Sequence, residues 1–240
     1  FNIIRIMQKI AKSDKSVKLI IFNSNKQKKI NELIKSDCNC KHLAPININT
    51  GSTLQSQYVK IWRNEEIYKV LIHELVHFFG IDMNLHRSQV AECDAKIKQI
   101  FNITPDSVDY VNESYTEIVA LLIHTSYVSY VSKVDLFLLL WLEISFTVLQ
   151  IAKIISYYDL GKSRCIIKNI PGCNKKNISQ STSVLSYFIV KGCVFYNLSD
   201  VLKFIDEDVM FGEREIEYMK IIKKSFRNQK FYNDIDVHIK

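Results

Sequence analysis

Residues 67–80 read IYKVLIHELVHFFG, and this stretch predicts a buried helix. Apolar side chains cover nearly its whole circumference, which is typical of a helix inside a core. Asn64 is the expected N-cap, because Glu65 and Glu66 follow it, where the helix dipole favours negative charge. Gly80 is the expected residue after the last turn, since glycine readily adopts the left-handed conformation that ends many helices.

An HExxH pattern lies inside this predicted helix, formed by His73, Glu74 and His77. Side chains at i and i+4 project from one helical face, so both imidazoles can reach a single cation. Glu74 lies beside them and can hold a water against that cation. In the alternative, two histidines and a glutamate are satisfied within a core helix, and each then needs a buried partner. We therefore predict a zinc site.

Catalytic zinc needs a third protein ligand, and the segment NESYTE at residues 112–117 offers the strongest candidate. Glu113 and Glu117 repel each other at the i, i+4 spacing, within a helix as apolar as a core element. Buried neighbouring carboxylates are unfavourable unless a cation neutralises them. Glu113 is thus the predicted third ligand, and Glu117 the predicted acceptor for the ring N–H of His73. The alternative is a solvent-facing acidic stripe.

Other residues near the motif offer weaker third ligands. Met83 stands where an extended HExxHxxGxxH motif would need a histidine, and Asp82 falls one residue short of the related aspartate variant. His86 and Glu92 lie nearby without a recognisable frame. His124 lies on the same helical face as the two glutamates and is expected to belong to the core.

HELVH followed by NESYTE resembles the gluzincins, the zinc metallopeptidases of the thermolysin and zinc-aminopeptidase type, over about residues 45–160. The resemblance implies a zincin-like fold, zinc as cofactor and a peptide or protein substrate. It implies the zinc ligands His73, His77 and Glu113, the general base Glu74 and the ligand-supporting carboxylate Glu117. The spacing between the two motifs is longer than these families typically show. The RNEE segment at residues 63–66 and the Ile-, Asn- and Lys-rich composition also resemble uncharacterised proteins of large DNA viruses.

The resemblance further implies how substrate binds. A strand preceding the active helix should pair with extended peptide, and residues 50–62 are the candidate, with an ordinary inner strand as the alternative. The tetrahedral oxyanion should be stabilised by a tyrosine or histidine. The candidates are Tyr127, Tyr130, Tyr187 and His238. The alternative function is a catalytically inactive zincin that serves in binding or as a scaffold.

The order of predicted elements indicates an α+β fold: a small N-terminal mixed sheet on the HExxH helix, followed by a mainly helical part. Strands are expected at residues 17–22, 45–49, 58–62, 184–190 and 193–196, with a turn at Gly51 and Ser52. Helices are expected at residues 26–35, 64–80, 104–128, 134–158, 198–205 and 213–227. We predict one zincin-like catalytic domain over residues 1–240, with the sheet and active helix in 1–80. The third ligand lies in a helical part, 81–160, and 161–240 form an α/β extension.

The composition of the chain excludes several classes of protein. The chain has 240 residues, a net charge of +7, 48% hydrophobic residues and 24% charged ones, which excludes disorder and a disulfide miniprotein. No recognition motif accompanies the basic charge, so no nucleic-acid partner is expected. Six cysteines without a CxxC pair predict free, mostly buried thiols, and together with the lack of a visible signal peptide they predict an intracellular protein. Residues 136–152 are highly apolar but contain Glu143, which favours a core helix over a membrane span.

Overall fold

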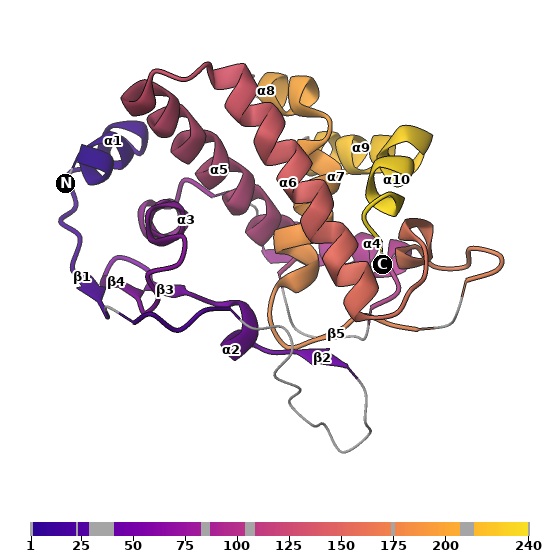
Figure 1. Cartoon of the computed structure of the whole chain (residues 1–240). Coiled ribbons are helices and arrows are strands. Elements are labelled where there is room, and N and C mark those ends of the chain that lie inside the picture. The colour runs from indigo at the N-terminus through magenta and orange to yellow at the C-terminus, as the bar shows by residue number, and fades with distance from the viewer. Residues whose placement is uncertain are drawn as a thin grey trace. The chain divides into compact units, whose positions relative to one another are not determined.

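The computed structural model describes residues 2–22, 24–28, 41–82, 87–103, 109–173, 176–206 and 214–239. These residues form a mainly helical structure with small sheets, which confirms the predicted α+β class (Figure 1). The chain divides into two compact units, each built from three segments. The first unit comprises Phe1–Glu32, Pro45–Asn84 and Tyr115–Leu140, and the second comprises Leu33–Ala44, Leu85–Ser114 and Trp141–Lys240. The single domain over residues 1–240 stays a prediction.

The first unit contains a three-stranded mixed sheet of order β1-β4-β3. β1 (Leu19–Ile21) runs parallel to β4 (Tyr58–Ile61), and β3 (Gly51–Leu54) runs antiparallel to it. The strands expected at residues 17–22 and 58–62 are therefore confirmed. The turn expected at Gly51 and Ser52 is wrong, because both residues pair with β4.

The strand expected at residues 45–49 is also wrong. Pro45–Ile48 forms a short helix, α2, and the Asn49 N–H donates to the Pro45 carbonyl at 2.8 Å. Proline suits a first helical position because its ring fixes φ near the helical value. The helix expected at residues 26–35 is not formed at residues 26–28, and the rest of it lies outside the described residues.

The HExxH helix is α3 (Ile67–Phe79), which contacts β3, β4 and the N-terminal helix α1 (Asn2–Ile10) (Figure 1). Its predicted end is confirmed: Gly80 has φ 65°, and the Ile81 N–H reaches back to the Val76 carbonyl at 2.9 Å. Asn64 is not the N-cap. The cap position is Glu66, which makes no side-chain capping hydrogen bond.

A long helix, α5 (Val111–Ser132), carries the second motif. It begins later than residue 104, because Asp109 and Tyr110 are not helical, while residues 104–108 lie outside the described residues. Its first N–H groups are capped from α4 (Arg87–Ile100), a helix that the sequence did not predict. Asp94 Oδ1 accepts hydrogen bonds from the N–H groups of Tyr110 at 3.0 Å and Val111 at 3.2 Å. A distant carboxylate thus replaces the expected local cap.

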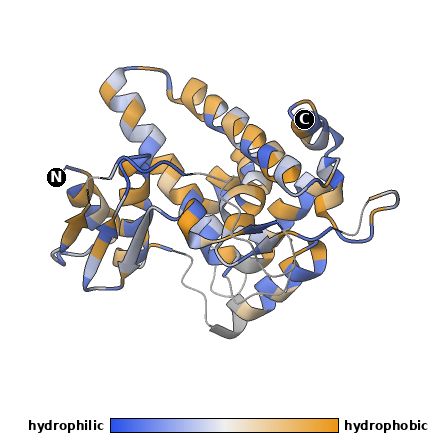
Figure 2. Cartoon of the chain, turned by 60° about the horizontal axis from the view of Figure 1, so that its bottom comes forward, coloured by the Kyte–Doolittle hydropathy of each residue, from blue (hydrophilic) through white to orange (hydrophobic). Residues whose placement is uncertain are grey.

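The apolar stretch near residue 136 forms α6 (Leu136–Tyr157). It is the one helix among the described residues that is long and apolar enough to cross a membrane, and 39% of its apolar window is buried. Apolar residues occur along the whole of this helix (Figure 2). Its second half is mostly buried, as expected of a core helix, but its first half is not. The exposed large side chains there are Phe137, Leu138, Trp141, Leu142 and Phe146. The core-helix prediction therefore holds only in part, and the intracellular location stays a prediction.

The two strands expected at residues 184–196 are helical instead. Leu185–Val190 is a π-helix that continues into α7 (Lys191–Phe195). When a short run is apolar on all sides, the spacing of its apolar residues does not distinguish a strand from a helix. This explains why strands were expected here. Gly192 permits the packing, since a Cβ there would lie 2.4 Å from Ile151 Cδ1 of α6.

The rest of the second unit is assembled from short elements. α8 (Leu198–Asp206) and α9 (Arg214–Phe226) confirm the predicted terminal helices, whereas α10 (Gln229–Asp236) was not predicted. β2 (His42–Leu43) pairs in parallel with β5 (Ser179–Gln180).

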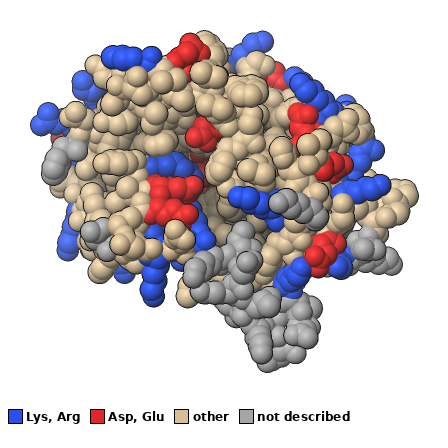
Figure 3. Space-filling model, in the orientation of Figure 1, with Lys and Arg blue, Asp and Glu red and all other residues tan. Residues whose placement is uncertain are grey.

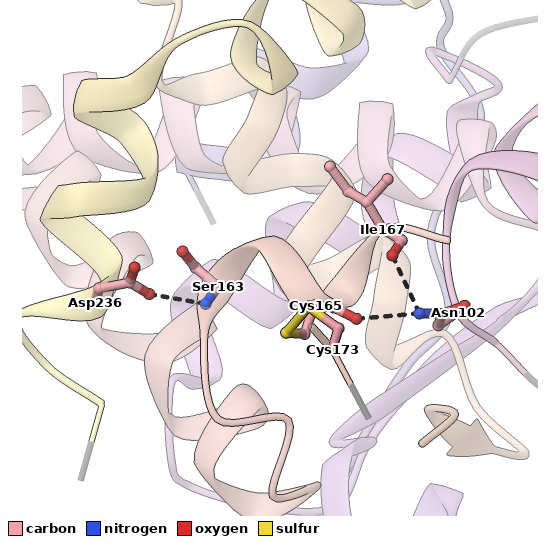
Figure 4. The surroundings of a disulfide bond; sticks show 6 residues. All are labelled: Asn102, Ser163, Cys165, Ile167, Cys173 and Asp236. Carbon is pink, nitrogen blue, oxygen red and sulfur yellow. Dashed lines mark hydrogen bonds between the residues drawn. A yellow bond between two sulfur atoms is a disulfide. The ribbon is translucent and has the colours of Figure 1, made fainter. Parts of the chain in front are cut away.

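The cysteines differ from expectation. Cys165, in the 3-10 helix Ser163–Ile166, forms a disulfide with Cys173 (Figure 4). The Asn102 amide donates to the Cys165 and Ile167 carbonyls at 3.1 Å each, which ties this segment to the residues after α4. Cys93 and Cys193 are buried and form no disulfide among the described residues, as predicted. Cys38 and Cys40 lie outside the described residues. The prediction of free thiols is therefore wrong for Cys165 and Cys173.

Basic side chains are dispersed rather than gathered on the face that Figure 3 shows. Several are neutralised locally: Lys28 pairs with Glu66 at 2.7 Å, and Lys224 pairs with Asp200 at 2.5 Å. The expected lack of a nucleic-acid partner stays a prediction.

Candidate metal centre

The two motif histidines lie one turn apart on the buried helix α3. Their ring centroids are 5.0 Å apart and the ring planes meet at 76°. His73 is 7% exposed, and His77 is half-buried near the C-terminal end of the helix. The apolar circumference that predicted burial is thus the reason that these imidazoles are withdrawn from solvent.

Glu113 completes a cluster with these histidines. One ligand atom from each of His73, His77 and Glu113 lies within 4.8 Å of the other two. Glu113 occupies the first turn of α5, and the boundary between the compact units falls just after it, inside this continuous helix. Glu117, one turn further on, belongs to the first unit together with α3.

Glu117 is almost fully buried and holds two side chains of α3. Its Oε2 lies 3.0 Å from Nδ1 of His73, which is the contact expected from the sequence. Its Oε1 forms an ion pair with Nζ of Lys69. Lys69 was missed by the sequence analysis, although it precedes His73 by one turn on the same helical face. A hydrogen on Nδ1 of His73 leaves Nε2 to donate its lone pair to a cation.

Asp82 supplies the equivalent contact to the second histidine. Its Oδ2 lies 3.0 Å from Nδ1 of His77. Asp82 was expected only as a weak candidate for a zinc ligand, and its contact with His77 was not predicted. Gly80 could have indicated this contact, because a left-handed residue at the end of a helix turns the chain back and brings the following residues close to the last turn.

The third element of the motif, Glu74, points at strand β3. The Thr53 hydroxyl lies 2.7 Å from Glu74 Oε2 and 2.9 Å from the Glu74 carbonyl. A Cβ placed on Gly51 would lie 2.7 Å from Glu74 Oε1. Glu74 as a whole is only 7% exposed, and its carboxylate is packed against the sheet.

Positive and negative side chains alternate next to the cluster, in the order Lys28, Glu66, Lys69 and Glu117. Burial alone would raise the pKa of Glu66, but Lys69 and Lys28 hold it below its usual value. Burial, and then the positive charge of Lys69, lower the pKa of the half-buried His124. Lys69 thus lies between the carboxylates of Glu66 and Glu117, and its charge offsets part of the negative charge of this acidic site.

Among the described residues, Glu92 does not join the cluster. Glu92 is exposed and pairs with Lys96 at 2.8 Å, and this hydrogen bond lowers the pKa of its carboxyl group. Met83 and His86 lie outside the described residues. Of the predicted oxyanion partners, Tyr127 and Tyr130 are excluded by distance. They follow Glu113 by at least fourteen helical positions, which corresponds to about 20 Å along α5. Tyr187 and His238 stay predictions.

The donor set fits zinc. Two imidazole nitrogens and one carboxylate oxygen form the protein ligand set of many catalytic zinc sites, in which a fourth position stays open. The two Nδ1–carboxylate contacts match the carboxylate–histidine–metal arrangement that orients such ligands.

Comparisons with known proteins do not identify a function for this chain. No family model matches the chain, and no solved structure matches it. A curated uncharacterized protein of Acanthamoeba polyphaga mimivirus is 29% identical over 87 residues. The similarity covers 36% of this chain and 21% of the viral protein, so the chain spans about a fifth of that relative. It indicates no activity.

Proposed function

We propose that this chain is a zinc-dependent metallopeptidase with a gluzincin-type site on a zincin-like fold. The observation that carries the proposal is the convergence of ligand atoms of His73, His77 and Glu113 within 4.8 Å of one another. Glu74 follows the first of these ligands directly in the sequence. Both histidines also have carboxylate partners on Nδ1, as zinc-binding histidines usually do.

Each residue then has a defined chemical role. Zinc in such a site supplies a Lewis acid, which lowers the pKa of water and polarises a carbonyl. His73, His77 and Glu113 would hold the ion. Glu74 takes a proton from the attacking water and passes it to the amine that leaves when the peptide bond breaks.

Strand β3 suits an extended peptide substrate. Among the described residues, β3 is an edge strand of the sheet. The Trp62 N–H donates to the Thr50 carbonyl at 3.0 Å, so hydrogen-bonding groups at Thr50 and Ser52 face β4. Because this direction alternates along a strand, the main-chain groups of Gly51 and Thr53 face the open edge. An added peptide strand would pair there.

Metal analysis tests the ligand set. Purified wild-type protein should contain one zinc ion per chain, and Glu113→Ala should lose most of it. Glu92→Ala is the matched control, because Glu92 is an exposed glutamate outside the cluster, and its zinc content should equal that of the wild type. Loss of zinc in the Glu92 variant alone would overturn the assignment of the third ligand.

Hydrolysis of a peptide library tests the activity. Glu74→Gln should keep its zinc and lose turnover by at least about a hundredfold, since general-base catalysis contributes that much. Full activity in this variant would refute Glu74 as the base. Stoichiometric zinc in a wild type that hydrolyses no peptide would favour the alternative of a catalytically inactive zincin.

A further inference from the structure

We propose that Thr53 and Gly51 of β3 are positioning residues that fix the carboxylate of Glu74 to the edge strand. The inference rests on the proposed function, which makes Glu74 the general base. It adds that the base and the strand offered to a peptide are held in one rigid frame. Neither Thr53 nor Gly51 touches the reacting atoms; both act through Glu74.

Thr53 supplies the attachment. Its hydroxyl has a single hydrogen, which it can donate to Glu74 Oε2 at 2.7 Å or to the Glu74 carbonyl at 2.9 Å. The contact to the carboxylate is the shorter one, and hydrogen bonds to an ionised acceptor are stronger than neutral ones. The Thr53 hydroxyl therefore favours one orientation of the Glu74 side chain. The main-chain carbonyl of Glu74 is a second acceptor that the same hydroxyl can reach.

Gly51 supplies the space. A Cβ at this position would lie 2.7 Å from Glu74 Oε1, 2.9 Å from Glu74 Cγ and 2.9 Å from Val70 Cγ1. Such distances are shorter than van der Waals contact, so any larger residue must push the carboxylate or the helix away. Gly51 and Thr53 lie two positions apart on one face of the strand. Gly51 leaves room for the Glu74 carboxylate, and Thr53 forms a hydrogen bond with it.

The same two residues direct their main-chain groups to the open edge of the sheet. A peptide that pairs with this edge would bond to the backbone of Gly51 and Thr53, while Glu74 rests against their side-chain face. The distance from the base to the scissile bond is then set by one short strand. Catalysis is sensitive to this alignment, because a displacement of 1 Å can cost about a hundredfold in rate.

Three variants and one matched control test the proposal kinetically. Thr53→Val keeps the shape but removes the hydroxyl, Thr53→Ser keeps the hydroxyl, and Gly51→Ala adds the Cβ. Ser52→Ala is the control, since Ser52 lies between them and faces solvent. In Thr53→Val and Gly51→Ala, kcat should fall about ten- to a hundredfold. Zinc content and KM should stay within about twofold of the wild type, because neither residue is a ligand. Thr53→Ser and the control should keep most of kcat.

A double-mutant cycle measures the contact without zinc or substrate. Tm of the chelator-treated protein is compared for wild type, Thr53→Val, Glu74→Ala and the double variant. If the hydroxyl holds the carboxylate, Thr53→Val should lower Tm more in the presence of Glu74 than in the Glu74→Ala background. Equal shifts in both backgrounds would show no coupling and would overturn the proposal.

The outcomes separate this proposal from the proposed function. An active zinc protein whose Thr53→Val variant keeps its kcat overturns the positioning role alone. Equal loss of kcat in Thr53→Val and Thr53→Ser does the same, because the hydroxyl would then not matter. A wild type without zinc or hydrolysis overturns the proposed function and the positioning role with it, whatever coupling the cycle gives.

Discussion

Oε2 of Glu117 lies 3.0 Å from Nδ1 of His73, while Oε1 of the same carboxylate pairs with Lys69. One buried side chain of α5 therefore holds two residues of α3 that are a full turn apart. This arrangement orients the histidine and keeps Nε2 directed away from the carboxylate. It also compensates the charge of Glu117, which would be costly to bury alone.

Glu117→Ala should weaken zinc binding about ten- to a hundredfold, as is usual when the carboxylate behind a ligand histidine is removed. Glu117→Gln should lose less, because its amide oxygen can still accept the ring N–H. Competition with a chromophoric chelator measures the affinities. Wild-type affinity in Glu117→Ala would contradict an orienting role.

Asp82→Ala should also weaken zinc binding, but by less than Glu117→Ala. The His77–Asp82 pair is more exposed, at 23% and 21% of the two side chains, against 9% and 6% for His73 and Glu117. Water can replace an exposed partner more easily than a buried one. The same chelator titration compares the zinc affinities of the two variants. A larger loss of affinity in Asp82→Ala than in Glu117→Ala would contradict the argument from burial.

Asp94 should make stability depend on pH. Burial raises its pKa from 3.8 to about 6, despite hydrogen bonds from the Tyr110 and Val111 N–H groups. The folded state thus holds this proton more tightly than the unfolded chain. The stabilisation is complete below about pH 4 and is lost as pH rises through about 6, a change on the order of 2–3 kcal/mol.

Asp94→Asn tests this dependence, because asparagine keeps the accepting oxygen but does not ionise. The Tm of the variant relative to wild type should increase between pH 4 and pH 7. Asp109→Asn is a comparison, since Asp109 contributes only a minor repulsion. A constant difference in Tm between Asp94→Asn and wild type would contradict the shifted pKa.

The Cys165–Cys173 disulfide should stabilise the chain without serving the zinc site. It closes a loop with a sequence separation of 8, for which the loop-entropy argument gives about 2–3 kcal/mol. Reduction, or Cys173→Ser, should lower Tm. Zinc content should not change, because neither cysteine belongs to the ligand set. Identical Tm in oxidised and reduced protein would show that the bond does not form in solution.

Local sequence information was sufficient to predict the helix that carries His73 and His77 and to expect Glu113 close to them. The HExxH spacing places His73 and His77 on one face, and the repulsion between Glu113 and Glu117 indicated a cation nearby. Gly80 ends α3 as expected, since a left-handed residue is identifiable from the residue type alone. These inferences depend on neighbours within about one turn.

What the sequence left out depends on contacts between distant segments. Asp94 accepts the Val111 N–H from another helix, a contact between residues 17 positions apart that no local pattern shows. Thr53 reaches Glu74 across 21 positions, and Gly51 was interpreted as a turn because its close approach to α3 is visible only after folding. The apolar run at residues 184–196 was assigned to strands because burial on every side erases the period that would distinguish a helix.

The interleaving of the two units has a practical consequence for making and studying this protein. Each unit is assembled from three separated stretches of the chain, so no single truncation liberates either one intact. During synthesis His73 and His77 emerge well before Glu113 and Glu117, and the first unit is complete only once residues 115–140 have been made. Expression trials should therefore keep the chain whole, because no single cut releases either unit as one continuous piece.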